Sequence, residues 1–271
     1  MDNFALFLSF LWFLFFLFTA FYFYRFFKYR KELKKLKNRP LEKKYRQYIQ
    51  DIPLYKNLPE KYKKTMDYKI QRFFIEKDFI APYIKLTDEI KTLTAFYGCI
   101  LTAAYEEFCY PNLKYVYIYP KAIKKNIKRE YIVEEDVIIS GEALQDSVII
   151  SWHDAKYQIK HNKKRNIIIH EFAHMLDFAD GAADGVPPVT KEMFKEWKKT
   201  VLREYKLLLE KKQHHSKIEI DEYALTNEAE FFAVMTEYFF CNPKFLHYHF
   251  PDIYEELKKF YRLDTLIILE E

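Results

Sequence analysis

An uninterrupted apolar run near the N-terminus constrains this chain more than any other feature of its sequence. Phe4 to Tyr24 form 21 residues that are broken only by Ser9 and Thr19. A helix needs about 20 consecutive apolar residues to cross the hydrocarbon core of a membrane. The run therefore predicts one transmembrane helix at the start of the chain.

Basic residues follow the apolar run, and none precedes it. They are Arg25, Lys28, Arg30, Lys31, Lys34, Lys35, Lys37 and Arg39. Because basic flanking segments stay in the cytoplasm, we expect a single-pass protein of the inner (cytoplasmic) membrane, with its body in the cytoplasm. The run lacks the basic leader, short apolar stretch and small-x-small site of a cleaved signal peptide. We therefore expect an uncleaved anchor, whose basic cluster either binds anionic lipid or acts only as a topology signal.

Composition and charge exclude several classes of protein. The chain is 50% hydrophobic and 19% aromatic, which excludes disorder. Its formal net charge is +5, but residues 1–46 hold 11 Lys/Arg against 3 Asp/Glu, so they carry +8 and the remainder carries −3. This distribution argues against a nucleic-acid-binding surface. The odd cysteines Cys99, Cys109 and Cys241 have no paired metal-ligand spacing, and the four glycines are too scattered for a phosphate loop.

The sequence divides into an anchor over residues 1–24, a basic juxtamembrane spacer over 25–55 and one domain over 56–271. The pattern predicts a predominantly helical α+β domain with a small mixed sheet. We expect strands over residues 115–119 and 148–152, and helices over residues 59–79, 87–107, 165–179, 190–212 and 221–240. A loop is expected over residues 180–189.

The segment His170-Glu171-Phe172-Ala173-His174 matches the pattern H-E-x-x-H and follows three isoleucines, which suits a buried helix. Histidines four residues apart lie on one face of a helix and can bind one metal ion. Glu171 lies about 100° around the helix from His170, so it can reach a water on the metal without being a ligand. The alternative is a pair of core histidines with a salt-bridged glutamate.

A catalytic zinc usually takes three protein ligands and leaves a fourth position for water. No histidine follows at the short metzincin spacing. The expected helix over residues 227–240 carries Glu230 and Glu237 among apolar residues, where a carboxylate is costly unless it is paired or bound to metal. Both glutamates are therefore candidates at this point.

Three segments carry a resemblance to a known family. They are His170–Asp177 (HEFAHMLD), Tyr223–Glu230 (YALTNEAE) and Phe232–Phe240 (FAVMTEYFF). Over roughly residues 58–265 the chain resembles the Mlc titration factor A (MtfA) family of zinc-dependent peptidases, which is itself distantly similar to the anthrax lethal factor catalytic domain. The resemblance implies a zincin-like metallopeptidase domain of the gluzincin kind.

The resemblance also implies a role for each matching residue. His170, His174 and Glu230 become the ligands of one Zn²⁺ per chain. Glu171 becomes the general base, and Tyr223 becomes a hydrogen-bond donor to the transition state. These assignments agree with the ligand spacing of the H-E-x-x-H segment.

Two further carboxylates are expected behind the ligands. Glu237 lies two turns beyond Glu230 and so on roughly the same helix face, and Asp177 lies three residues past His174. Each could orient a ligand histidine. The alternatives are a core salt bridge for Glu237 and a surface charge near a helix end for Asp177.

The sequence thus predicts a membrane-anchored zinc metallopeptidase whose partners are the membrane and a peptide or protein substrate. A regulatory protein partner is open, because the named family member lacks a membrane segment and its own partner, a transcriptional repressor, is not transferable. The alternative function is a membrane-tethered binding protein that sequesters a partner and uses zinc structurally. Retention of Glu171 and Tyr223 argues against this alternative, because a structural site needs neither.

Overall fold

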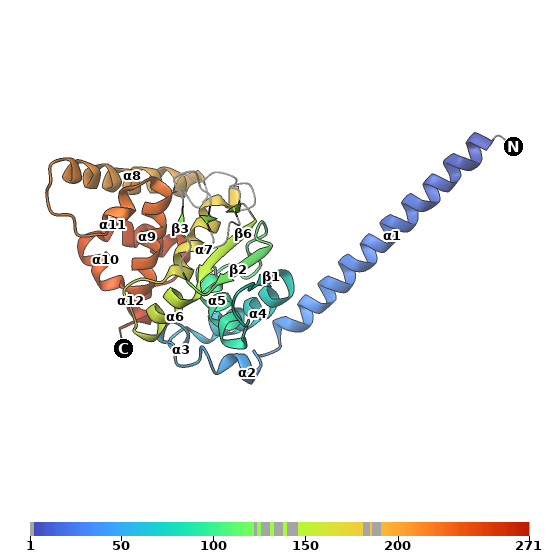
Figure 1. Ribbon diagram of the computed structural model, residues 1–271, viewed down its shortest axis with the longest axis horizontal. Coiled ribbons are helices and arrows are strands. Elements are labelled where there is room, and N and C mark those ends of the chain that lie inside the picture. The colour runs from blue at the N-terminus through green and yellow to red at the C-terminus, as the bar shows by residue number, and fades with distance from the viewer. Residues whose placement is uncertain are drawn as a thin grey trace. The chain divides into compact units, whose positions relative to one another are not determined.

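The computed structural model describes residues 3–121, 124–125, 131–132, 138–139, 146–180, 185 and 191–270. The chain separates into two compact units, Met1–Pro40 and Leu41–Glu271, and Figure 1 shows their secondary structure. Most of the loop expected over residues 180–189 lies outside the described residues.

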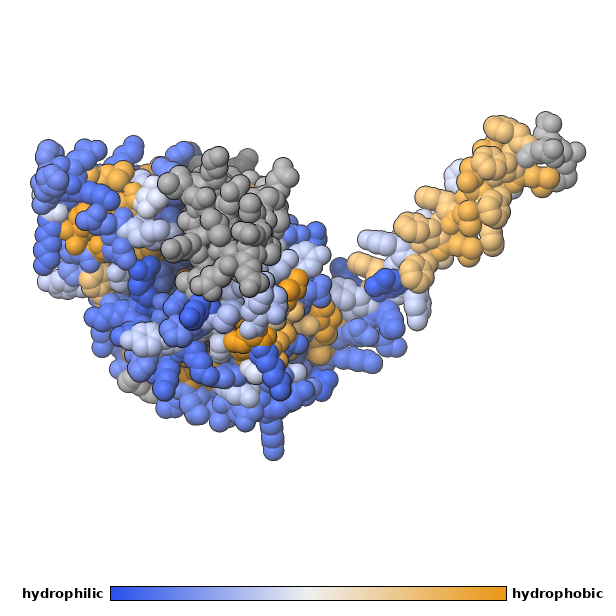
Figure 2. All heavy atoms as spheres, in the orientation of Figure 1, coloured by the Kyte–Doolittle hydropathy of each residue, from blue (hydrophilic) through white to orange (hydrophobic). Residues whose placement is uncertain are grey.

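The first unit is one long helix, α1 (Asn3–Lys37). Within it, Leu6–Lys37 is long and apolar enough to cross a membrane, and the face seen in Figure 2 is apolar over the N-terminal part of the helix. The helix continues through the basic cluster, where the Arg30 guanidinium lies 5.1 Å from the centre of the Phe26 ring. The first part of the expected spacer is therefore helical and continuous with the apolar run.

The second unit begins earlier than the expected division at residue 56. Four residues of the expected spacer lie in its core: Leu41, Ile49, Leu54 and Tyr55. Two short helices, α2 (Lys43–Arg46) and α3 (Pro53–Lys56), belong to this segment. The buried carboxylate of Asp67 holds it, accepting hydrogen bonds from the Leu41 amide at 3.2 Å, from the Tyr55 hydroxyl at 2.8 Å and from Arg46. The structure thus divides the chain at residue 41.

The described residues of the body form two small sheets. The first consists of β1 (Asp78–Ile80), β2 (Tyr115–Tyr119) and β6 (Ser147–Ser151), which are parallel in the order β1-β2-β6. The second is antiparallel and consists of β3 (Lys124–Lys125), β4 (Tyr131–Ile132) and β5 (Ile138–Ile139). The predicted helical α+β class is confirmed, with the two strand directions in separate sheets.

Helices make up most of the remaining body (Figure 1). They are α4 (Glu60–Glu76), α5 (Asp88–Ile100), α6 (Trp152–Lys160), α7 (Ile167–Asp177), α8 (Lys191–Gln213), α9 (Glu228–Cys241), α10 (Pro243–His249), α11 (Pro251–Tyr261) and α12 (Thr265–Ile268). The predicted cap of α5 is confirmed, since the Thr87 hydroxyl accepts a hydrogen bond from the Ile90 amide at 3.2 Å.

Two predicted helix ends were wrong, and one predicted helix is divided. The helix expected to reach residue 79 ends at Glu76 because Phe79 pairs with β2 as part of β1. The helix expected to reach residue 107 ends at Ile100. The helix expected over 221–240 is split into a short 3-10 turn, η3 (Glu222–Leu225), and α9. Asn227 makes the break, because its side chain caps a new helix by accepting from the Glu230 amide at 2.8 Å.

Helix α7 packs against β6, α5 and α9, so it lies at the centre of the body. Phe172 of α7 is fully buried, with its ring centre 5.0 Å from that of Tyr110 and 5.8 Å from that of Phe73. Gly98 of α5 faces this ring so closely that a Cβ there would lie 2.6 Å from Phe172 Cε1. This packing fixes the helix that carries the H-E-x-x-H segment.

Candidate metal centre

The start of α7 is fixed by polar side chains just before the histidines. The Asn166 side-chain oxygen accepts hydrogen bonds from the amides of Ile168 at 3.0 Å and Ile169 at 3.3 Å. The Gln158 side chain accepts from the Ile167 amide at 2.7 Å. These bonds satisfy amides that have no partner within the helix, so the register of the following residues is set.

The motif divides between the buried and the accessible side of α7. Phe172 and Ala173 face the core, and His170 is buried. Glu171 is only partly buried, and the His174 side chain is 25% exposed. One histidine of the motif is therefore buried, and the other is reached by solvent.

Helix α9 supplies two buried carboxylates to the same region. Glu230 and Glu237 are buried on a helix whose other buried residues are nearly all apolar. They are seven residues apart, so they lie on one face, and α9 packs directly against α7. Both expected candidates thus meet His170, but in different ways.

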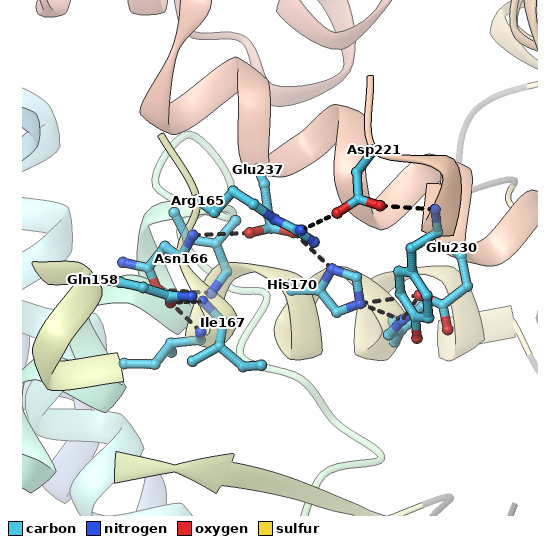
Figure 3. A network of polar contacts seen from close by, with 12 residues as sticks. Gln158, Arg165, Asn166, Ile167, His170, Asp221, Glu230 and Glu237 are labelled. Atoms are coloured by element: carbon cyan, nitrogen blue, oxygen red, sulfur yellow. Dashed lines mark hydrogen bonds and ion pairs between the residues drawn. The ribbon is translucent and has the colours of Figure 1, made fainter. Parts of the chain in front are cut away.

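Three ligand atoms converge at the α7–α9 contact (Figure 3). His170 Nε2 lies 3.2 Å from His174 Nε2 and 3.1 Å from Glu230 Oε2. The third edge, from His174 Nε2 to Glu230 Oε2, is 3.3 Å. The described residues thus present a nearly equilateral triangle of two imidazole nitrogens and one carboxylate oxygen.

The dimensions of the triangle fit a tetrahedral zinc. Bonds of about 2.0–2.1 Å in tetrahedral geometry separate the ligand atoms by about 3.3–3.4 Å, close to the observed edges. The donor set of two nitrogens and one oxygen is also the one that zinc accepts in catalytic sites. The residues present therefore fit the group.

The electrostatics of the triangle favour a positive charge at its centre. Burial by itself lowers the pKa of His170, but hydrogen bonds with Glu230 and Glu237 outweigh it and raise the pKa to about 10. Burial likewise raises the pKa of the Glu230 carboxyl, but hydrogen bonds with His170 and His174 hold it well below its usual range. A divalent cation would supply the same positive charge.

Glu237 lies behind the triangle, against the Nδ1 side of the His170 ring. Its Oε1 atom lies 2.8 Å from His170 Nδ1, and its Oε2 atom accepts a hydrogen bond from the Asn166 amide at 2.8 Å. A proton on Nδ1 that bonds this carboxylate leaves Nε2 as the nitrogen that would give up its proton to a metal. Glu237 thus contacts a candidate ligand, whereas Glu230 is part of the triangle.

The remaining site residues that the sequence predicts are Tyr223, Glu171 and Asp177. Tyr223 is in η3, with its ring centre 6.2 Å from that of His170, and it is 43% exposed. Glu171 is partly buried on α7, and its negative charge is a minor contribution to the raised pKa of His170. Asp177 is fully buried at the end of α7, so it is not a surface charge. Its expected role in orienting a histidine stays a prediction.

Sequence reasoning missed the polar residues that support the triangle. They are Gln158, Arg165, Asn166 and Asp221, all drawn in Figure 3. Asn166 had a readable signal, because asparagine directly before an apolar helical run is a typical N-cap. Arg165 and Asp221 had none, because they meet across 56 positions of the chain.

Comparison with known sequences identifies the class of this protein. Residues 26–262 match the glucose-regulated metallo-peptidase M90 family, and the chain belongs to that family. It is 33% identical over 239 residues to an uncharacterized protein of Synechocystis, a match that covers 84% of this chain and 87% of that protein.

Proteins named Mlc titration factor A are also similar. The one from Edwardsiella ictaluri is 34% identical over 125 residues, covering 45% of this chain and 48% of that protein. The one from Yersinia pestis is 30% identical over 168 residues, covering 52% and 57%. The matches thus span about half the length of these relatives. The resemblance to the MtfA family is confirmed, while the distant similarity to anthrax lethal factor stays a prediction.

Proposed function

We propose that this protein is a membrane-anchored, zinc-dependent peptidase that hydrolyses peptide bonds. The observation that carries the proposal is the triangle of His170 Nε2, His174 Nε2 and Glu230 Oε2, with edges of 3.1–3.3 Å. These three residues would hold one Zn²⁺ per chain. When bound, the metal supplies a water acidified to a pKa of about 7 and polarises the substrate carbonyl.

The residues around the triangle would each perform one step of hydrolysis. Glu171 takes a proton from the attacking water and delivers it to the leaving amine. The Tyr223 hydroxyl donates a hydrogen bond to the oxyanion, a contribution of about 3 kcal/mol. Glu237 holds His170 in the tautomer that leaves its Nε2 lone pair available.

The anchor is part of the same proposal. Helix α1 is long and apolar enough to span a membrane, and the basic residues that follow the apolar run favour a cytoplasmic body. The proposed protein is therefore single-pass in the inner membrane, with the peptidase body from Leu41 onward in the cytoplasm. Its partners would be lipid and a peptide or protein substrate, and not nucleic acid.

The alternative is a membrane-tethered protein that binds a regulatory partner and uses zinc only structurally. It is favoured by the name of the Mlc titration factor A relatives. The site geometry favours the peptidase, because structural zinc sites usually close four protein ligands around the ion. Three candidate ligands meet among the described residues, and one of them, His174, is reached by solvent.

Hydrolysis of a peptide library by the full-length chain in lipid nanodiscs tests the proposal. We expect cleavage that stops on chelation and returns with zinc, and that Glu171→Gln abolishes while zinc binding persists. Glu204→Gln, which removes a charge on α8 that pairs with Arg203 at 2.9 Å and is not part of the triangle, is the control and should cleave normally. Zinc binding without cleavage in the wild type would favour the tethered binding protein instead.

A further inference from the structure

We infer that Arg165 and Asp221 are positioning residues that tie the turn carrying Tyr223 to the buried carboxylate behind His170. The catalytic consequence of this tie rests on the proposed function, whereas the tie itself does not. Neither residue belongs to the H-E-x-x-H segment or to the triangle.

The Asp221 carboxylate bonds the turn through one oxygen and bonds Arg165 through the other. Its Oδ1 atom accepts a hydrogen bond from the Tyr223 amide at 2.9 Å, and its Oδ2 atom accepts from Arg165 Nη1 at 2.6 Å. The other terminal nitrogen of Arg165, Nη2, lies 3.4 Å from Glu237 Oε1. Figure 3 shows the guanidinium lying between the two carboxylates.

Glu237 Oε1 is also the atom that lies 2.8 Å from His170 Nδ1. A continuous chain of polar contacts therefore runs from His170 through Glu237, Arg165 and Asp221 to the backbone of Tyr223. One end of this chain sets a candidate metal ligand, and the other end sets the proposed oxyanion donor.

The turn is short and unevenly packed, because Ala224 and Leu225 are buried in the core whereas Tyr223 is largely exposed. Helix η3 has four residues, and its backbone bonds include Ala224 N–H to Asp221 O at 3.0 Å and Thr226 N–H to Tyr223 O at 3.1 Å. Tyr223 is 43% exposed, so packing covers only part of its side chain. The triangle, by contrast, is built on two long helices in the core.

The ion pair between Arg165 and Asp221 is partly exposed, so its loss should affect the turn more than the stability of the whole protein. The Arg165 and Asp221 side chains are 38% and 43% exposed, and pairs of this kind contribute little to global stability. Asp221→Asn, which breaks this pair and leaves the contact of Arg165 with Glu237, should therefore keep the fold intact and loosen the local geometry of the turn. This distinguishes positioning from a general structural role.

Hydrogen exchange of the full-length, metal-free chain in nanodiscs tests the tie without using activity. Arg165→Gln and Asp221→Asn should each speed exchange of the Tyr223 and Ala224 amides by about fivefold, which corresponds to about 1 kcal/mol at 1.4 kcal/mol per tenfold. Arg203→Gln is the matched control, because Arg203 pairs with Asp252 at 2.7 Å on an exposed surface. Unchanged exchange at the turn in both site variants would overturn the inference.

A double-mutant cycle on kcat tests whether the tie acts through Tyr223. Asp221→Asn should lower kcat about fivefold in the wild type, by the same conversion, with a smaller change in KM. It should lower kcat no further in Tyr223→Phe, because the positioned hydroxyl is already absent. An equal fall in both backgrounds would overturn the role through Tyr223.

Failure of the inference and failure of the proposed function give different results. Cleavage that depends on Glu171, together with unchanged exchange at the turn, rejects the tie and leaves the peptidase. Faster exchange in Arg165→Gln, together with cleavage that survives Glu171→Gln, supports the tie and rejects the proposed mechanism.

Discussion

Glu237→Gln is the substitution that most sharply tests the arrangement behind the metal centre. The carboxylate serves three donors with two oxygens: Oε2 accepts from the Asn166 amide, while Oε1 faces His170 Nδ1 and Arg165 Nη2. A glutamine has a single acceptor oxygen and an amide group that only donates. It can therefore serve the Asn166 amide or His170 Nδ1–H, but not both.

Each orientation of the glutamine side chain loses one of these two hydrogen bonds. If the glutamine oxygen keeps the hydrogen bond from the Asn166 amide, the glutamine NH₂ group faces His170 Nδ1. His170 then favours the tautomer with its hydrogen on Nε2, the atom whose lone pair a metal needs. Loss of an orienting partner of this kind weakens metal binding about 10–100-fold. If the oxygen keeps His170, the buried Asn166 amide loses its partner, at a cost of about 1–3 kcal/mol of unfolding free energy.

Zinc affinity by chelator competition, together with urea unfolding in EDTA, measures both costs. We expect Glu237→Gln to weaken zinc binding at least tenfold, to lower the unfolding free energy, or to do both in part. Glu256→Gln is the control, because Glu256 is buried on α11 and bonds Lys259 at 2.7 Å. Unchanged zinc affinity and unchanged stability in Glu237→Gln would refute the reasoning.

Three further predictions follow from the core and the site. Gly98→Ala should lower the unfolding free energy by about 1–3 kcal/mol in a urea titration, because its Cβ would lie 2.6 Å from the buried Phe172 ring; unchanged stability would contradict the close packing. Burial lowers the pKa of Lys69 from 10.5 to about 8, although Cys99 and Cys109 act to raise it. The unfolded chain therefore binds more protons than the folded chain between pH 8 and pH 10.5. The stability of the wild type relative to Lys69→Met should therefore rise by about 3 kcal/mol from pH 8 to 10.5, and a flat difference would be the contrary result. Tyr223→Phe should lower kcat about 100-fold with zinc content unchanged, whereas full activity would remove Tyr223 from the mechanism.

Features that depend on neighbouring residues were predictable from the sequence. The apolar run, the strand over residues 115–119, the Thr87 cap and the helix around H-E-x-x-H are all encoded within a few positions of themselves. Glu230 and Glu237 were visible as carboxylates in an apolar helix, although spacing alone could not rank them. The family resemblance separated their roles, with Glu230 as a ligand and Glu237 behind it.

Features that depend on distant contacts were not predictable. The body begins at Leu41, whose amide donates to Asp67, 26 positions away, and no local pattern marks that contact. The link from Arg165 to Asp221 and Glu237 joins residues 56 and 72 positions apart. Long-range polar contacts of this kind leave no periodicity in the sequence, so the support of the site emerged only in three dimensions.

The most direct test of the central claim is the position of zinc in a crystal of the protein grown with one equivalent of the metal. The account predicts one anomalous peak at the zinc edge, about 2.0–2.2 Å from His170 Nε2, His174 Nε2 and Glu230 Oε2. A peak on other residues, or no peak at this triangle at stoichiometric zinc, would contradict the account.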